Sequence, residues 1–435
     1  MNDSVDISGS VMTSSGTASP LGVGASIATD PDALLALGTP PPVETDGGAT
    51  LLEWLRARRA AGPIWQDERG HYHLFRHADL LDVVADPVTY SSDTVTRPSG
   101  GAESPPPGTL LLMDPPAHRT MRRLVTKAFS ARRVNDLGPR ITELATELLD
   151  GISARTPEAD GAVEVDLVDA FANPLPVTVI AELLGVPFTD LDRFQKWADC
   201  LLTDRMDDEK GAERLNTTIL EMRDYLQGRV DIRRAEPAED LIGTVVSAEV
   251  DGRTLTDQEA INFAALLLLA GHVTTAVLLG NTLLCLDTAP GEWAALRADP
   301  SRIPAVLEET MRLRPPFLAI ERVTTAPVEL CGEQLPENAV IHLWLLSANR
   351  DERVFADPDV FRPNRSETPQ IAFGHGIHHC LGASLARMEG KIAMELMLER
   401  FAEVEVRRDV ELWWHQDNVL GARHLPLRML PDSRD

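Results

Sequence analysis

One cysteine lies in a stretch of sequence that could hold a metal ion. Cys380 belongs to FGHGIHHCLG, residues 373–382, in which the glycines are Gly374, Gly376 and Gly382. A metal-binding cysteine must present a thiolate, which backbone N–H groups and a helix N-terminus stabilise. Glycine lets the backbone approach the sulfur and adopt positive φ. The stretch therefore favours a thiolate ligand covered by Phe373, and the alternative is an incidental cysteine in a glycine-rich loop that leads into a helix.

Two other segments carry polar residues at informative spacings. Glu309 and Arg312, in EETMR, stand three apart on one helical face. Such a pair alone is usually solvated and contributes a few tenths of a kcal/mol, roughly. AGHVTT, residues 270–275, interrupts a long apolar run, residues 263–286. Thr274 is placed to bond to the carbonyl four residues earlier and to open the helix locally.

The full spacing around the cysteine resembles the haem-thiolate signature of the cytochromes P450. It reads Phe373-x-x-Gly376-x-x-x-Cys380-x-Gly382 and runs into Leu385-Ala386-Arg387. EETMR precedes it at the interval usual in that family, and FRPNR and SANRDE are similar to family phrases. The resemblance implies a mainly α fold with a minor β portion, a triangular helical prism that holds haem b between the oxygen-binding helix and the cysteine-loop helix. It also implies Cys380 as the axial ligand and a monooxygenase that inserts one atom of O2 into C–H or C=C bonds.

The resemblance assigns further residues at matching positions. Arg365, in FRPNR, completes a structural ion-pair triad with Glu309 and Arg312 that holds the cysteine loop. Four residues match positions that contact the haem propionates, namely His118, Arg122, Arg322 and His378. Ala270 and Gly271 let the oxygen-binding helix pass close over the haem, and Thr274 takes part in O2 activation. His379 has no such match and is left unassigned.

The chain departs from the family pattern at one position of the oxygen-binding helix. Val273 stands where most relatives carry an acid that is thought to relay protons. His272 is not taken as a substitute, because many relatives carry a histidine there together with the acid. We hypothesise that protons arrive through ordered water, with a substrate hydroxyl as a further route.

Several phrases resemble the actinomycete macrolide hydroxylases of the erythromycin C-12 hydroxylase type more closely than the family at large. They include LLLAGHVTTAVLLGN, RLRPPF and LWLLSANRDE. This implies hydroxylation or epoxidation of a macrolide in antibiotic biosynthesis. The expected pocket is lined by the loop 91–113, the region around 199–212, and Leu266, Ala270, Pro316, Phe317 and Leu318. Alternatives are a non-macrolide substrate such as a carrier-bound peptide, a non-catalytic P450-like auxiliary protein for a glycosyltransferase, and a haem sensor.

The segment 118–133 carries seven basic residues, counting His118, and no acid. Most such runs are solvated faces, but the resemblance places this helix on the proximal side near the cysteine. We therefore expect Arg119, Arg123 and Lys127 to help to dock an acidic ferredoxin. The ferredoxin and its reductase would deliver electrons from NAD(P)H.

The bulk composition limits the remaining possibilities. The 435 residues include 41 basic and 67 acidic ones, for a net charge of −26, which argues against nucleic acid as a partner. The four cysteines are scattered, which suits a reducing cytoplasm. The N-terminal residues have neither the basic start nor the apolar core of a signal peptide. We expect residues 1–45 to be disordered and residues 46–435 to form a single domain.

The elements that must position these residues follow from periodicity. Helices are expected at 49–61, 77–87, 140–152, 218–230, 303–314 and 381–402, with a hairpin at 63–77 that turns at Glu68-Arg69-Gly70. Residues 114–287 read as almost wholly helical, and residues 323–346 and 403–412 read as strands. The apolar run 263–286 is interrupted by polar residues, so we expect a buried helix rather than a membrane span.

Overall fold

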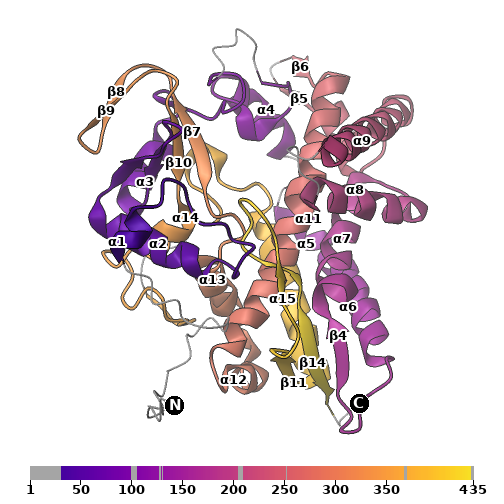
Figure 1. Ribbon diagram of the computed structural model, residues 1–435. Coiled ribbons are helices and arrows are strands. Elements are labelled where there is room, and N and C mark those ends of the chain that lie inside the picture. The colour runs from indigo at the N-terminus through magenta and orange to yellow at the C-terminus, as the bar shows by residue number, and fades with distance from the viewer. Residues whose placement is uncertain are drawn as a thin grey trace, which may run out of the picture.

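The computed structural model describes residues 31–98, 105–126, 129, 131–203, 209–250, 252–366 and 370–432. Figure 1 shows a helix-rich part around the long α11 and a β-rich part that includes β7 and β10. The mainly helical architecture with a minor β portion confirms the expected fold class.

The helices follow the expected amphipathic segments. In chain order they are α1 (Pro31–Leu35), α2 (Ala49–Ala61), α3 (His77–Ala85), α4 (Ala117–Thr126), α5 (Ala131–Asp136), α6 (Gly138–Ser153), α7 (Pro174–Leu184), α8 (Leu191–Thr203), α9 (Glu209–Ala235), α10 (Leu241–Ser247), α11 (Asp257–Asp287), α12 (Glu292–Ala298), α13 (Ile303–Leu313), α14 (Leu345–Ala348) and α15 (Ala383–Arg400). In α6, for example, Ile141, Ala145 and Ile152 are buried at helical spacing and face the core.

The strands are short and form several small sheets. They are β1 (Ile64–Gln66), β2 (Tyr72–Leu74), β3 (Tyr90–Ser91), β4 (Val163–Asp166), β5 (Glu249–Val250), β6 (Arg253–Thr254), β7 (Ile320–Thr324), β8 (Val328–Leu330), β9 (Glu333–Leu335), β10 (Val340–Leu343), β11 (Phe401–Val406), β12 (Trp413–Trp414), β13 (Ala422–His424) and β14 (Pro426–Pro431). Among the described residues the largest sheet has the order β1-β2-β10-β7-β3. The expected hairpin is confirmed, since Ile64 pairs with Leu74 in antiparallel register.

The helix α11 runs through the centre of the molecule (Figure 1). Its start is fixed by a capping box, in which the Thr256 and Glu259 side chains and backbone N–H groups bond reciprocally. It packs against α7, α9, α13 and α15. This helix is long and apolar enough to cross a membrane, but 67% of its most apolar window is buried inside the fold. It is therefore the core helix that its sequence indicates.

Two parts of the chain differ in detail from the local sequence patterns. Within the expected tail, Leu34 and Val43 are buried at 4% and 2% exposure in the core cluster that contains residues of α2. Residues 1–30 lie outside the described residues. The segment 114–287 is mostly helical, as expected, and is interrupted by short strands that include β4, which pairs with β14. That pairing joins residues about 260 positions apart, which local periodicity cannot reveal.

Candidate functional site

The loop before α15 presents Cys380 through a tight backbone path. Gly374 and Gly376 have φ of 71° and 68°, the left-handed region that glycine adopts without strain. A Cβ on Gly376 would lie 3.0 Å from the carbonyl oxygen of Val84. The backbone N–H of Cys380 then donates to the Phe373 carbonyl oxygen at 2.8 Å. The glycines therefore allow the turn that brings the thiol to the start of the helix.

The sulfur of Cys380 is surrounded by groups that favour a thiolate. Burial raises the pKa of the thiol above its ordinary value, and hydrogen bonds from the backbone N–H groups of Gly382 and Ala383 and the charges of Arg122 and Arg387 offset only part of that rise. These N–H groups belong to the first turn of α15, which Gly382 caps. Cys380 nevertheless remains exposed to solvent. Hydrogen bonds and positive charges from the protein thus stabilise the thiolate form of Cys380 on one side of the sulfur. The other side is open to solvent, as a metal ligand requires.

Open space lies directly after the cysteine. A Cβ on Gly382 would meet no atom within 4 Å, although Gly382 stands between the exposed Cys380 and the buried Ala383. Phe373 lies on the protein side, where the Arg387 guanidinium stacks 4.4 Å from its ring centre. Phe373 also packs at the edge of the main core cluster.

Three of the four expected propionate-binding residues form a buried cluster of donors. The rings of His118 and His378 lie 4.4 Å apart. Burial first, and then neighbouring positive charge, lowers their pKa values to about 4 and about 3. Burial also lowers the pKa of Arg322 to about 10, and this cation contributes to the shift of His378. His118 Nε2 is buried without a hydrogen-bond partner in the described part of the chain.

This cluster fits the propionates of a haem. An anion would reduce the electrostatic repulsion among these nitrogen donors. It would also accept a hydrogen bond from the buried nitrogen that has no partner. Ser92 Oγ holds His378 Nε2 at 2.9 Å. Arg122, the fourth expected residue, donates to the carbonyl oxygen of His379 at 2.7 Å and so lies on the cysteine loop. The backbone carbonyl of His379 therefore takes part in this contact. The sequence assigns no role to the His379 side chain.

The structure brings together the ion-pair triad expected from EETMR and FRPNR. Arg312 and Glu309 form two hydrogen bonds of 2.8 Å. Arg365 Nε donates to the same carboxylate at 2.9 Å, and the three side chains are 3–7% exposed. The single carboxylate neutralises one of the two guanidinium charges, so this buried cluster keeps a net positive charge that polar groups must stabilise. The remaining Arg312 and Arg365 donors bind backbone carbonyls of residues 349–360.

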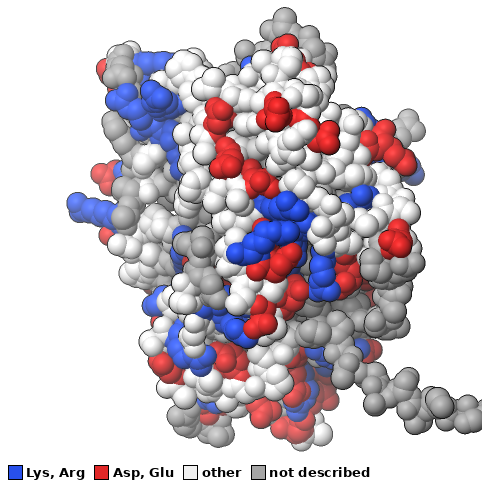
Figure 2. All heavy atoms as spheres, turned by 90° about the vertical axis from the view of Figure 1, so that its left-hand side faces the viewer, with Lys and Arg blue, Asp and Glu red and all other residues white. Residues whose placement is uncertain are grey.

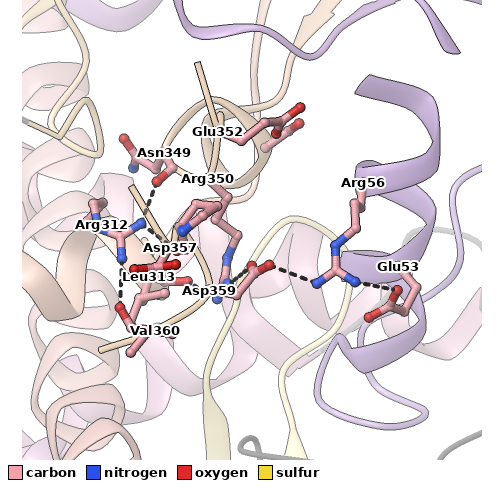
Figure 3. Close-up of polar contacts among 12 residues, drawn as sticks. Glu53, Arg56, Arg312, Leu313, Asn349, Arg350, Glu352, Asp357, Asp359 and Val360 are labelled. Carbon is pink, nitrogen blue, oxygen red and sulfur yellow. Dashed lines mark hydrogen bonds and ion pairs between the residues drawn. The ribbon is translucent and has the colours of Figure 1, made fainter. Parts of the chain in front are cut away.

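A wider polar network surrounds the triad, and sequence reasoning missed its members (Figure 3). Arg350 binds Asp359, which also binds Arg56 of α2 at 2.7 Å. Asn349 accepts a bond from Arg312 on its carbonyl, and its side chain accepts the N–H of Ile371 at 2.9 Å. Asn349 therefore connects the triad to the segment that leads into the cysteine loop. The phrase SANRDE was the available signal, although it was noted only for its likeness to the family.

A second ion pair ties α13 directly to α15. Arg387 Nε donates to Glu308 at 2.5 Å, and Gln370 holds the other oxygen of the same carboxylate at 3.0 Å. The two adjacent acids of EETMR thus have different partners, because Glu309 is buried in the triad. The sequence singled out only the second of them.

The oxygen-binding helix has the local features that its sequence indicates. Thr274 Oγ1 donates to the Ala270 carbonyl at 2.8 Å. Ala270 is exposed although it lies in the middle of the central helix. Gly271 lies close to Ile180, because a Cβ added to Gly271 would be 3.2 Å from the Ile180 side chain. Val273 is buried at 5% exposure. Ala270 therefore leaves α11 open near the threonine, whereas Gly271 lets α11 pack closely against Ile180 of α7.

His272 does not replace the missing acid in this arrangement. It is 1% exposed, and both ring nitrogens lack hydrogen-bond partners in the described part of the chain. Burial, followed by the nearby His415, lowers its pKa to about 4, so the ring is neutral at pH 7.

The expected pocket residues are placed differently from one another. Leu266 is half-buried at the edge of a core cluster, Pro316 is half-buried, and Phe317 is 40% exposed. Leu318 is 2% exposed in the cluster that contains Trp54 and Trp344, so it supports this segment rather than facing open space. Leucine after an exposed aromatic residue on an extended backbone points to the opposite side, which explains the difference.

Residues 418–420 lie beside Pro316–Leu318, and the sequence did not reveal them. Leu420 N donates to Pro316 O and Leu318 N to Asn418 O, each at 3.0 Å. Phe317 and Val419 form an isolated β-bridge. The Asn418 side chain adds bonds of 2.9 and 2.8 Å to Ala319. Only long-range pairing reveals this contact.

The loop 91–113 borders a cavity of about 820 Å³ at the N-terminal end of α11. Its lining includes Asp93, Met113, Asp114, Arg253 and Glu259. Residues 99–104 of this loop, and residues 204–208 of the region around 199–212, lie outside the described residues.

The expected docking residues lie on α4. Arg119 and Arg123 are exposed, and Lys127 lies outside the described residues. Arg122 extends from the same helix to the cysteine loop. In Figure 2, Lys and Arg gather in the upper left of the face shown, whereas acids and bases are mixed over its centre.

Comparisons with known proteins agree with this geometry. The profile of the family "Cytochrome P450" matches residues 177–423. The erythromycin C-12 hydroxylase of Saccharopolyspora erythraea is 46% identical over 383 residues, 87% of this chain and 94% of that protein. The cyclomarin C epoxidase CymV of Salinispora arenicola is 42% identical, over 89% and 98% of the two chains. The open structure of cytochrome P450 EryK from S. erythraea superimposes with a TM-score of 0.84 at 43% identity, over 91% and 99%. With its cysteine loop, ion-pair triad and central helix in place, the chain belongs to the cytochrome P450 family.

Proposed function

We propose that the chain is a haem-thiolate monooxygenase that hydroxylates a macrolide in antibiotic biosynthesis. The observation that carries the proposal is the environment of Cys380. Its exposed sulfur accepts hydrogen bonds from backbone N–H groups at the start of α15. When bound, the haem supplies the activation of O2 for insertion of one oxygen atom into the substrate.

The chain's own residues hold and prepare this site. Gly382, Ala383 and Arg387 favour the thiolate form of Cys380. His118, Arg322 and His378 offer nitrogen donors to the two propionates, and Arg122 fixes the cysteine loop from α4. The hydroxyl of Thr274 lies at the open face of α11, where it is placed to hold water or to pass a proton. Because Val273 has no proton to give, water or a substrate hydroxyl completes the path.

Similarity to named relatives supports the substrate class. The 46% identity to erythromycin C-12 hydroxylase extends over 94% of that protein and favours hydroxylation of a macrolide. The 42% identity to cyclomarin C epoxidase favours epoxidation as the second candidate reaction. The exposed Ala270 and Phe317 are the groups that we expect substrate to contact.

Electrons are supplied by an acidic ferredoxin and its reductase from NAD(P)H in the cytoplasm. The exposed Arg119 and Arg123 of α4 support this part of the proposal, since they stand out on a chain with a net charge of −26. A carrier-bound peptide substrate and a non-catalytic role beside a glycosyltransferase are the competing proposals. The stabilised thiol at position 380 weighs against the non-catalytic role.

The test uses the purified holoprotein and two spectra. We expect the reduced CO complex to absorb near the position typical of thiolate haem, and Cys380→His to shift it to the position typical of histidine ligation. A panel of macrolides is then scored by the low- to high-spin change, with a carrier-bound peptide as the competing ligand. A globin-like CO spectrum of the wild type would refute the thiolate site, and a spin change with the peptide alone would refute the macrolide.

A further inference from the structure

A group of histidines lies on one face of the five-stranded sheet and takes no part in the propionate cluster described above. His71 precedes β2 and His73 lies within it, so both side chains point to the same face of the strand. His342 of β10 is opposite His73 in parallel register and opposite Glu321 of β7 in antiparallel register. The sheet therefore brings three imidazoles and a carboxylate to one surface.

Each ring of this group except His71 has its tautomer fixed by a neighbour. Trp344 Nε1 donates to His73 Nδ1 at 3.1 Å, so His73 carries its proton on Nε2, which lies 3.3 Å from Asp67. His342 Nδ1 lies 3.2 Å from the Glu321 carboxylate, which can only accept. The lone pair of neutral His342 is therefore on Nε2, and this atom faces His71 Nδ1 at 3.2 Å.

We propose that His71 Nδ1 and His342 Nε2 form a bidentate site for a divalent transition-metal ion of the Zn²⁺ class. Two nitrogens bound at about 2.0–2.1 Å, with an angle between the right-angle and the tetrahedral value, lie about 2.8–3.4 Å apart. The observed separation of 3.2 Å falls in this range. Imidazole nitrogen is the ligand type that Zn²⁺, Cu²⁺ and Ni²⁺ share.

A second feature of the group indicates the same ligand. Histidines that bind metals almost always donate their other ring N–H to a carboxylate or a carbonyl. Glu321 occupies this position behind His342, and the stacked ring of His73, 4.6 Å away at 21°, fixes the plane of His342. The His342 side chain is 21% exposed, which leaves room for water to complete the coordination.

Binding replaces the proton that lies between the two rings. In neutral His71 this proton leaves Nδ1 and is regained on Nε2 through solvent exchange, so both ligands remain neutral imidazoles. No other group changes its charge. The bound ion then connects the turn before β2 to β10 and stabilises the folded chain by a free energy that rises with the logarithm of its concentration above the Kd.

Another group of potential ligands serves as an internal control. Ligand atoms of Asp166, Asp169 and His424 lie within 4.8 Å of one another. This group offers a single imidazole, whose Nδ1 is bonded to Asp166 at 2.6 Å, and Asp169 is exposed. We therefore assign the site to the pair His71–His342 and use His424→Gln as the matched variant.

The experiment titrates the untagged holoprotein with Zn²⁺ by calorimetry and with Cu²⁺ by electron paramagnetic resonance. We expect one saturable site with splitting from two nitrogens, and a thermal unfolding midpoint that rises with Zn²⁺. His71→Gln and His342→Gln abolish this binding, Glu321→Gln weakens it about tenfold or more, and His424→Gln leaves it unchanged. The CO spectrum of each variant verifies that it is folded. Absence of the saturable site in the wild type, or its loss in His424→Gln alone, would overturn the proposal.

Discussion

Arg312 binds both carboxylate oxygens of Glu309 at 2.8 Å, on side chains that are 3% and 4% exposed. This pair lies on α13 and, with Arg365, anchors the segment that precedes the cysteine loop. Exposed pairs at the same spacing contribute little, but a buried one is costly to break because the partner is left uncompensated.

Removing the shared acid should therefore destabilise the fold strongly. We expect Glu309→Ala to lower the free energy of unfolding by about 3–5 kcal/mol, since Arg312 and Arg365 remain buried without a counter-charge. Glu53→Ala is the control, because its pair with Arg56 has the same spacing but is 46–52% exposed, and it should cost less than about 1 kcal/mol. Urea unfolding of both variants measures the difference, and equal costs would contradict it.

Two glycines of the cysteine loop should respond differently to alanine. Gly376→Ala places a Cβ at φ of 68° and 3.0 Å from Val84 O, so we expect a loss of about 1–3 kcal/mol in stability with or without haem. Gly382→Ala meets no atom within 4 Å and should leave the apoprotein unchanged. It should instead weaken haem retention, because the open space is where the macrocycle would lie. Unfolding and haem-transfer rates test the two variants, and unchanged retention in Gly382→Ala would refute this use of the space.

The apoprotein should lose stability in acid through the buried imidazoles. The pKa values of His118 and His378 in the folded chain, about 4 and about 3, lie below the ordinary 6.5. Both rings are therefore neutral when folded and take up protons on unfolding, so stability falls as pH decreases from 6.5 towards 4. His118→Asn should reduce this slope by at most about 1.4 kcal/mol per pH unit. Bound haem should also reduce it, because propionates favour the charged rings. An unchanged slope in His118→Asn would contradict the assignment.

Proton delivery can be examined at two adjacent positions of α11. Thr274→Ala removes the hydroxyl that binds the Ala270 carbonyl, and we expect product per NAD(P)H to fall by up to about 10²-fold while substrate binding is retained. Val273→Glu introduces an acid at a position that is 5% exposed and should change both coupling and rate. Measured hydrogen peroxide distinguishes uncoupling from slow reduction. If Val273→Glu leaves coupling and rate unaltered, the water or substrate route loses its motivation.

Electron transfer should depend on the exposed charges of α4. We expect Arg119→Glu and Arg123→Glu to lower the ferredoxin-supported rate most at low salt, because the steering field is screened within about 10 Å at 0.1 M salt. Arg69→Glu makes the same charge change in the exposed turn between β1 and β2 and should have little effect. The rate is measured against ionic strength for all three variants. A ferredoxin-supported rate that does not change with ionic strength would argue against docking on this helix.

Local sequence patterns predicted most helices and the main site residues. They did not predict contacts between distant segments of the chain. The spacing around Cys380, the triad and the hydroxyl of Thr274 could be found because each depends on residues close in sequence or on a family motif. The pairing of β4 with β14 and the contact of Asn418 with Ala319 depend on distant backbone groups, which have no local signal. The burial of Leu318, at 2% exposure, could not be read from the sequence, because a run of apolar residues does not say which of them faces the core.

The strand β14 lies between β4 and β11, so the middle of that sheet is supplied by residues 426–431. During synthesis on the ribosome, residues 163–166 emerge long before the strand that completes their hydrogen bonds. The apolar side chains of Val163, Val165 and the helices packed against them therefore stay partly exposed until the whole haem-binding part of the chain has been translated. Cotranslational folding of this protein is therefore a late event, and chaperones that shield nascent apolar surfaces should have a long interval in which to bind it.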